Sequence, residues 1–470
     1  SCDYSYLTFY HMKIIFDHRP CVNKFCQLNR NLNKKINQYK FYDLSLKEYI
    51  AIAIFSIIYV LIIGRIRFRI PIWVSMSIGA VLMLVFQVIG LESAVKSIQF
   101  DVIIFLFGMF SIVTALDRSG VLKLLAVKML SRAKTPNTLL MMFVVGMGLL
   151  AAFLVNDTIA LMGIPLVIYI SKHLGIRPHV FLIALAFGVT VGSVMTPIGN
   201  PQNLLIALQS GVPLPFVNFV KVLAVPTLIN LFVTYYILKT YFKKDLLQIS
   251  TVSSSSIVEN NIIENPRLAK ISIIILVITI AGFFVSEILH FMQLAEIRIS
   301  FVALAGAAAL YAVSSERRKI LWQVDYTVLI FFVAMFVVTA ALWESGAVSL
   351  FMKHLPNPNP NDIFQSNALI SIYSVTFSQI LSNVPFVALY NFVMIGNGFT
   401  GAHVIQWLML AAASTIAGNL TILGAASTII IIQSAETRGV RAFTFLEFLK
   451  VGSLVTVANL AIYYLFLVMI

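Results

Sequence analysis

The sequence predicts an all-α polytopic membrane protein made of two inverted repeats of about five transmembrane helices each, with re-entrant hairpins and broken helices. Three observations lead to this fold class. Of the 470 residues, 60% are hydrophobic and 11% are charged, whereas soluble domains carry about 25% charged residues. Apolar runs of roughly 17–25 residues, enough to cross a bilayer as helix, recur from residue 48 onward. The two halves also match each other at a nearly constant offset.

The apolar runs and the segments between them divide the chain into four parts. Residues 1–46 form a polar basic tail, 47–240 the first membrane repeat, 241–267 a polar cytoplasmic linker and 268–470 the second, inverted repeat. The linker contains four consecutive serines and an Asn-Asn pair, a composition that cannot bury a core. Spans are predicted near 48–64, 71–89, 101–117, 178–210 and 217–240, with a shorter pair in 138–171, and near 268–290, 298–313, 325–343, 402–434 and 447–469, with a shorter pair in 366–398.

Local matches between the two halves indicate an internal duplication. The matching segments are 109–120 with 335–346, 154–156 with 381–383, and 196–199 with 421–424, at offsets of 226, 227 and 225. Each match alone is weak because apolar helices resemble one another by chance. Three matches that hold one spacing favour duplication.

The charges of the loops indicate how the repeats are oriented. Five full spans and one hairpin give an odd number of crossings, so the second repeat is predicted to be inverted. With the loop after the first span in the cytoplasm, 21 Lys and Arg lie inside and 4 lie outside, as the positive-inside rule requires. The basic tail would lie outside in this orientation, against the rule, but the larger number of loop charges is given more weight. The net charge of +14 is therefore assigned to cytoplasmic loops rather than to nucleic-acid binding.

The first interruption of an apolar segment is Asn156-Asp157-Thr158. It stands between two apolar arms that are each too short to span comfortably, which predicts a hairpin that enters the membrane, turns there and returns. A carboxylate at that depth is costly, so Asp157 is expected to coordinate a cation or carry a proton rather than only cap the second arm. Asp101 and Asp325 stand at equivalent helix starts and are interpreted as caps near the interface.

The second interruption runs from Thr196 to Asn203 between two apolar flanks. Two prolines and a glycine break the helix here. Unwound carbonyls suit a cation, whereas free N–H groups at the start of the next half-helix, together with Asn and Gln amides, suit an anion. The candidate ligands are Thr196, Pro197, Gly199, Asn200 and Asn203. Asn156, Asp157 and Gly199 are the candidate ligands of a Na⁺ ion.

The second half repeats both interruptions without an acid. Ser382 and Asn383 correspond to the first hairpin tip, and residues 418–428 correspond to the broken span. The candidate ligands there are Ser382, Asn383, Thr421, Gly424, Ser427 and Thr428. Ser and Thr also pack membrane helices, so ligand contact at Ser427 and Thr428 stays open beside a packing role. The asymmetry predicts that charge is handled mainly by the first half.

At these residues the chain resembles the ion-transporter superfamily of citrate and dicarboxylate transporters, arsenite permeases and certain sodium/proton antiporters. The resemblance covers about residues 48–470 and is clearest at Asn156–Thr158 with Pro165, at 192–203, at Ser382-Asn383 and at 418–428. It implies hairpin tips and unwound loops that bind ion and substrate at Asn156, Asp157, Thr158, Gly199, Asn200, Ser382, Asn383 and Gly424. The two tips have the sequences Asn-Asp-Thr and Ser-Asn-Val, whereas the dicarboxylate branch has Ser-Asn-Thr at both. The Asn-Asp form resembles the arsenite permease and antiporter branches more closely.

The predicted function is a secondary active transporter that moves a small anion, either a carboxylate or an arsenite-type oxyanion, coupled to Na⁺ or H⁺ by alternating access. The alternatives are a sodium/proton antiporter of the same superfamily and an ion channel. The P-loop and zinc-protease motifs are missing from the sequence, so no enzyme and no ATP-driven pump is predicted. No cofactor beyond the coupling ion is expected. The expected partners are the transported ion, the lipid bilayer of the cell membrane and a second copy in a homodimer.

Overall fold

A computed structural model describes residues 46–63, 68, 70–133, 135–174, 177–247, 263–295, 297–348, 355–422 and 424–470. The predicted tail, apart from its last residue, and most of the predicted linker lie outside the described residues. Every regular element among the described residues is helical. The all-α fold class is therefore confirmed.

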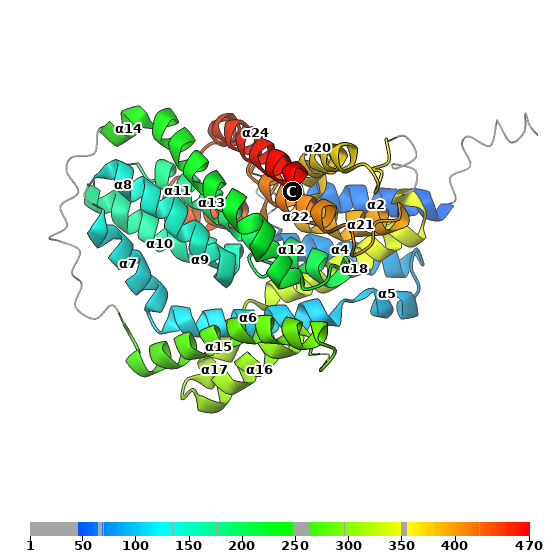
Figure 1. The fold of residues 1–470 in the computed structure, drawn as a ribbon, viewed down its shortest axis with the longest axis horizontal. Helices are drawn as coiled ribbons and strands as arrows, with labels where there is room; N and C mark the ends of the chain where they lie inside the picture. Colours follow the sequence, from blue (N-terminus) through cyan, green and yellow to red (C-terminus); the bar gives the residue numbers. More distant parts are fainter. Residues whose placement is uncertain are drawn as a thin grey trace, which may run out of the picture. The chain divides into compact units, whose positions relative to one another are not determined.

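The helices run in the order expected from the apolar segments (Figure 1). The first half contains α2 (Leu46–Ile63), α4 (Ile72–Val85), α5 (Leu91–Ser97), α6 (Phe100–Arg118), α7 (Val121–Arg132), α8 (Pro136–Met141), η1 (Met142–Gly146), α9 (Met147–Leu154), α10 (Asn156–Leu174), α11 (His179–Gly192), η2 (Ser193–Met195), α12 (Pro201–Gln209), α13 (Pro215–Tyr241) and α14 (Lys243–Leu247). The second half contains α15 (Pro266–Phe291), α16 (Ile299–Val313), α17 (Arg317–Gln323), α18 (Tyr326–Glu344), α20 (Ile363–Leu381), α21 (Asn383–Gly396), α22 (Val404–Ala417), α23 (Ala426–Thr437) and α24 (Phe445–Met469).

Within the described residues, 6 helices are long and apolar enough to cross a membrane. They are Phe100–Arg118, Pro136–Leu154, Pro215–Tyr241, Pro266–His290, Tyr326–Glu344 and Phe445–Met469. Shorter apolar helices lie between them, including α11 and α22. Many of these helices carry large apolar side chains that are exposed, such as Val277, Ile278 and Val457, which suits lipid as the surrounding solvent.

Helices of the two halves occupy equivalent places. The helix α6 corresponds to α18, α10 to α21, α11 to α22, α12 to α23 and α13 to α24. Unusual backbone conformations recur at the same offset, because Val155 and Ser382 have φ values of 63° and 67°, and Gly120 and Gly346 have φ values of 83° and 84°. Non-glycine residues rarely adopt a positive φ. Its recurrence at equivalent positions is what an internal duplication predicts.

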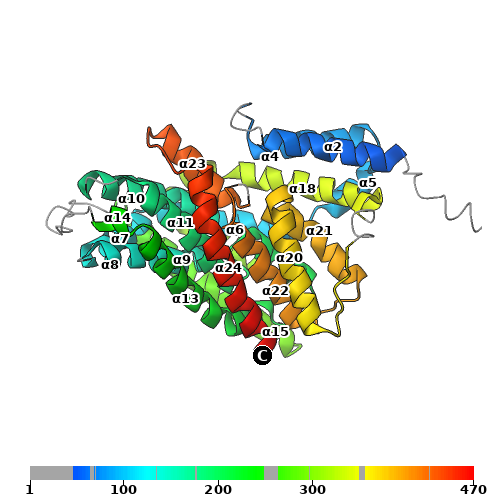
Figure 2. The same cartoon turned by 90° about the horizontal axis from the view of Figure 1, so that it is seen from above.

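Helices of the first half pack against helices of the second half, so the two halves share one helical core. The helix α6 packs on α16 while α18 packs on α4, and α10 packs on α23 while α12 packs on α21. Figure 2 shows α24 running beside α20 and α22. Buried polar side chains join α13 to α24, since Asn459 Nδ2 donates to Thr234 Oγ1 at 3.2 Å and the Thr227 and Tyr463 hydroxyls lie 2.7 Å apart. Such hydrogen bonds hold helices together in lipid, where no hydrophobic force does so.

One expectation about the first hairpin is wrong. Its first arm, formed by α8, η1 and α9, is a continuous run of 19 residues, Pro136–Leu154, which is long enough to cross a membrane. Interruption by a π-turn at Met142–Gly146 does not shorten it. The length of the first arm therefore does not indicate that the hairpin is re-entrant. The depth at which its tip lies decides whether it is.

The two acids interpreted as helix caps differ. Asp325 is the N-cap of α18, and its Oδ1 accepts from the N–H of Thr327 at 3.1 Å. Asp101 lies inside the first turn of α6 and accepts from Arg298 Nη1 at 2.7 Å and from Ser300 Oγ at 2.6 Å. Asp101 is thus a link between α6 and α16 and not a cap.

A polar cluster links the ends of α6, α15 and α17. Glu316 accepts from Arg118 Nη2 at 2.6 Å and from Nε at 3.2 Å, and its other oxygen accepts from Asn265 Nδ2 at 2.8 Å. The hydrogen bonds from Arg118, and then that from Asn265, hold the pKa of Glu316 below its usual range. A carboxylate with a lowered pKa in the folded state stabilises the fold only while it is ionised.

This cluster gives a pH-dependent prediction. The contribution of Glu316 is present above the carboxyl pKa of the unfolded chain, about 4.3, and is lost as the pH falls through the lower folded-state pKa. For a partly exposed ion pair of this kind we expect about 1 kcal/mol. Thermal unfolding of the purified protein should show Glu316→Gln less stable than wild type at pH 7, with the difference shrinking below about pH 4. An equal difference at both pH values would contradict this assignment, and Glu92→Gln, at an exposed pair with Lys96, is the matched control.

Candidate functional site

Each hairpin tip is hydrogen-bonded to the broken span of its own repeat. The backbone N–H of Asn156 donates to the carbonyl of Gly199 at 2.8 Å, and the N–H of Asn383 donates to the carbonyl of Gly424 at 3.2 Å. Gly199 lies between α11 and α12, in the middle of one broken span. A tip bound there reaches only the depth of that break, which supports a re-entrant hairpin. The fold therefore brings together the tips and breaks that the sequence singled out.

Asp157 stands in the first turn of α10, directly after the tip. Its side chain is half-buried, as is that of Thr158, while Asn156 is buried. The Asn156 Oδ1 accepts from the N–H of Asp157 at 2.8 Å, so this side chain satisfies one of the free N–H groups at the start of α10. A carboxylate at a helix N-terminus is favoured by the helix dipole. Asp325 at the start of α18 is close enough to interact electrostatically with Asp157.

Polar side chains of the first break are mostly bonded to the break itself. Asn200 Oδ1 accepts from the N–H of Asn203 at 2.8 Å and caps α12. Asn203 Nδ2 donates to the carbonyls of Ser193, Val194 and Thr196 at 3.1–3.2 Å. In this conformation the two amides hold the unwound loop, and ligand contact by them remains a prediction.

The first break is also tied to the second repeat through Thr415 of α22. Thr415 Oγ1 lies 3.2 Å from Asn200 Nδ2, 3.3 Å from Gln202 Nε2 and 3.3 Å from Asn203 Oδ1. All four side chains are buried. Thr415 was not among the predicted site residues, because a threonine inside an apolar span gives no signal of its own.

The second break is held by a glutamine that the sequence analysis missed. Gln379 of α20 donates to the carbonyl of Ala417 at 2.8 Å and accepts from Thr421 Oγ1 at 2.8 Å. At the equivalent place in the first half, Thr196 Oγ1 donates to the backbone carbonyl of Ala152. The two threonines thus have the same role with different acceptors. A glutamine inside an apolar segment, close to the tip, is the signal that could have found Gln379.

Several buried polar atoms around the second break have no hydrogen-bond partner among the residues that the structure describes. They are Asn383 Oδ1, both side-chain polar atoms of Asn419, Ser427 Oγ and Thr428 Oγ1. Ser427 and Thr428 are equivalent to Gln202 and Asn203, whose side chains are hydrogen-bonded. The two breaks therefore differ: the first is internally satisfied and stands beside Asp157, whereas the second presents unpaired oxygens. Hard cations prefer oxygen ligands, and neutral carbonyl and amide oxygens are among them.

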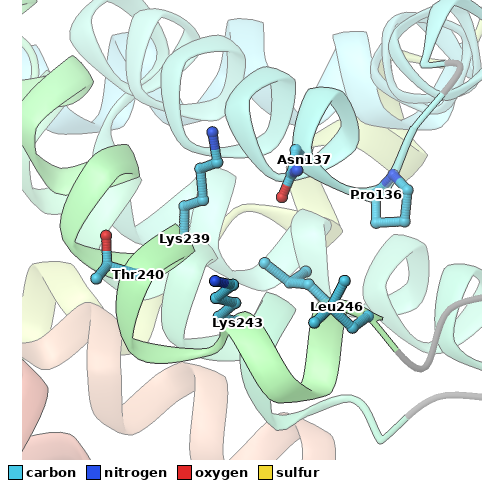
Figure 3. A pocket seen from close by; sticks show the side chains of 7 residues that line it. Pro136, Asn137, Lys239, Thr240, Lys243 and Leu246 are labelled. Carbon is cyan, nitrogen blue, oxygen red and sulfur yellow. The ribbon is translucent and has the colours of Figure 1, made fainter.

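A cavity of about 460 Å³ lies away from the two tips. It is lined by Pro136, Asn137, Lys239, Thr240, Lys243, Leu246 and Leu247. Figure 3 shows Lys239 of α13 and Asn137 of α8 on opposite walls. Pro136 starts the first arm and is separated from the tip by the length of that arm, roughly 28 Å at 1.5 Å per residue. This cavity is therefore separate from the candidate site.

Comparisons with known proteins show which families and folds this chain is similar to. A family model described as "Citrate transporter" matches residues 58–417. An uncharacterized transporter of Mycobacterium tuberculosis is 28% identical over 425 residues, covering 88% of this chain and 96% of that protein. The silicon efflux transporter LSI3 of Oryza sativa is 25% identical, with 78% and 86% covered. The crystal structure of the Alcanivorax borkumensis YdaH transporter matches with a TM-score of 0.51 and 13% identity, covering 80% of this chain and 86% of that one, which is a likeness of fold.

Proposed function

Because the chain belongs to the citrate transporter family, and is therefore an integral membrane transporter, we propose that it is a secondary active transporter for a small anion. The anion is a carboxylate or an arsenite-type oxyanion, and its movement is coupled to Na⁺ or H⁺ by alternating access. The proposal places the protein in the cell membrane and gives it no enzymatic activity.

The observation that carries the proposal is the pair of hairpin tips, each bonded to a break in a buried span. Non-helical backbone at membrane depth occurs only where it is buried in protein or lines a water-filled cavity. In transporters with inverted repeats, such breaks form the binding site for substrate and coupling ion. A channel does not require two of them in equivalent places.

Both breaks offer oxygen ligands for the coupling cation. The unpaired oxygens of Asn383, Asn419, Ser427 and Thr428 suit a Na⁺ ion. A bare Na⁺ ion is smaller than a water molecule, so it can be bound by oxygens that water cannot reach. The predicted Na⁺ ligands of the first half remain available to a cation, because the Gly199 carbonyl accepts one hydrogen bond and has a second lone pair.

Asp157 supports a second candidate within the same superfamily. A half-buried carboxylate beside a hairpin tip can exchange one proton for one cation, which is the chemistry of a sodium/proton antiporter. Under the anion-transport proposal, the same carboxylate binds the coupling cation together with Asn156. The two candidates differ in whether ion movement needs an anion.

Purified protein in liposomes separates these candidates. An inward Na⁺ gradient is imposed, and uptake of labelled citrate or arsenite is measured beside the signal of an internal pH dye. The anion-transport proposal expects Na⁺- or H⁺-dependent, saturable accumulation of one of these substrates. A Na⁺-dependent pH change with no substrate present favours the antiporter. Unsaturable flux that never exceeds equilibrium favours a channel and contradicts both.

A further inference from the structure

One face of α20 carries buried polar groups that lack hydrogen-bond partners in the described part of the chain. Asn367, Ser374 and Ser378 are each 0% exposed, and none of their side-chain polar atoms has a hydrogen-bond partner among the described residues. At 3.6 residues per turn, these three positions and Ser382 at the tip fall within an arc of about 80°. They form a polar line from the start of α20 to the second hairpin tip.

These groups are not satisfied in the way that helical serines usually are. A serine in an apolar helix commonly donates to the carbonyl one turn earlier, and Ser371 of the same helix does so, at 2.6 Å from the carbonyl of Asn367. Ser374 and Ser378 make no such bond. A buried polar group without a partner destabilises the fold. The polar line therefore costs stability in the conformation described here.

The first repeat shows that the fold does not need this polar line. At an offset of 227 residues, Asn367, Ser374, Ser378 and Ser382 correspond to Leu140, Met147, Ala151 and Val155. These four residues are also buried. The arms pack in the same way, because α9 lies on α11 as α20 lies on α22. Apolar side chains thus fill the same structural place, and the polar ones require another reason.

We propose that this face of α20 is the route by which the coupling cation reaches the second hairpin tip. The inference rests on the proposed function and adds the path of the ion to it. Serine hydroxyls and an amide oxygen at successive turns can replace part of the hydration of a small hard cation. The line begins at Asn367, five residues after Asp362, an exposed carboxylate that caps α20, and ends at Ser382 and Asn383. Asp362 places a negative charge at the end of α20 where the line begins, and this charge attracts cations.

Cysteine modification tests the route without requiring transport. In a background with Cys2, Cys21 and Cys26 changed to serine, Ser378→Cys is compared with Ala151→Cys, the equally buried equivalent in the first repeat. Full-length protein in liposomes is treated with a cationic and an anionic methanethiosulfonate reagent. We expect Ser378→Cys to react with the cationic reagent about tenfold or more faster than with the anionic one, because the acidic entrance concentrates cations. Ala151→Cys should stay unreactive.

Equal protection of both cysteines would overturn the route, and faster reaction with the anionic reagent would overturn its assignment to a cation. A second variant removes the polar groups without adding non-hydrogen atoms: Asn367→Leu, Ser374→Ala and Ser378→Ala together. Its thermal midpoint should equal or exceed that of wild type, while the Na⁺ concentration for half-maximal uptake rises. A lower midpoint with unchanged Na⁺ dependence would show a packing role instead. Because modification rates need no transport, failure of the proposed function would leave the cysteine result readable.

Discussion

Replacing Asp157 with Asn should lower ion-coupled transport by about 100-fold or more, because a site that loses its only ionisable ligand loses the charge that binds the coupling ion. Asparagine keeps the shape of the side chain and its capping ability. The start of α10 and the bond between Asn156 and Gly199 should therefore persist. Substrate uptake and the internal pH signal are measured in liposomes, with size-exclusion chromatography to confirm that the variant folds.

Asp101→Asn is the matched control for this prediction. Asp101 is also a carboxylate in the first turn of an apolar helix, but it is paired with Arg298 and Ser300. Its replacement should lower the thermal midpoint and leave coupling intact. If the Asp157 variant transports normally, the coupling ion is bound elsewhere, and the oxygens of the second break become the first candidates.

Replacing Gly199 with Ala should disrupt the first break. A Cβ at this position would overlap the backbone of Ser193, and a backbone neighbour cannot move aside as a flexible side chain can. Overpacking of a buried site costs about 1–3 kcal/mol. The shift should also move the Gly199 carbonyl away from the N–H of Asn156, so transport is expected to fall together with stability.

Gly396→Ala is the control, since a Cβ at Gly396 would meet nothing within 4 Å. Its thermal midpoint should be close to that of wild type. Thermal unfolding and substrate uptake are measured for both variants. Wild-type stability of Gly199→Ala would mean that the break is loosely packed, and it would remove the argument that the tip is held at a fixed depth by Gly199.

Much of the fold could be predicted from the sequence because its signals are local. Spans follow from runs of apolar residues, breaks follow from prolines and glycines, and repeats follow from spacing. The first arm is longer than the apolar run predicts, because the run begins at Thr138 whereas the helix also contains Pro136 and Asn137. Thr135 caps the helix before the apolar run begins, so the helix starts two residues earlier than the run.

Long-range partners could not be predicted in the same way. Glu287 was not singled out by the sequence, yet it is buried in α15 and accepts from the N–H groups of Phe216 and Val217 at 2.6 and 3.1 Å. It satisfies the free N–H groups at the start of α13. Its partners lie about 70 positions earlier in the chain, beyond the reach of any local pattern.

The sequence by itself determined the membrane class, the duplication and the residues at the tips and breaks, since each depends on neighbouring residues and on the dimensions of a bilayer. Only the tertiary structure decided which polar side chains are satisfied. Asn200 and Asn203 bond to their own loop and to Thr415, whereas Ser427 and Thr428 stay unpaired. Residue type fixes what a side chain can donate or accept, but whether a partner lies within 3.5 Å is set by the packing of helices that are distant in sequence.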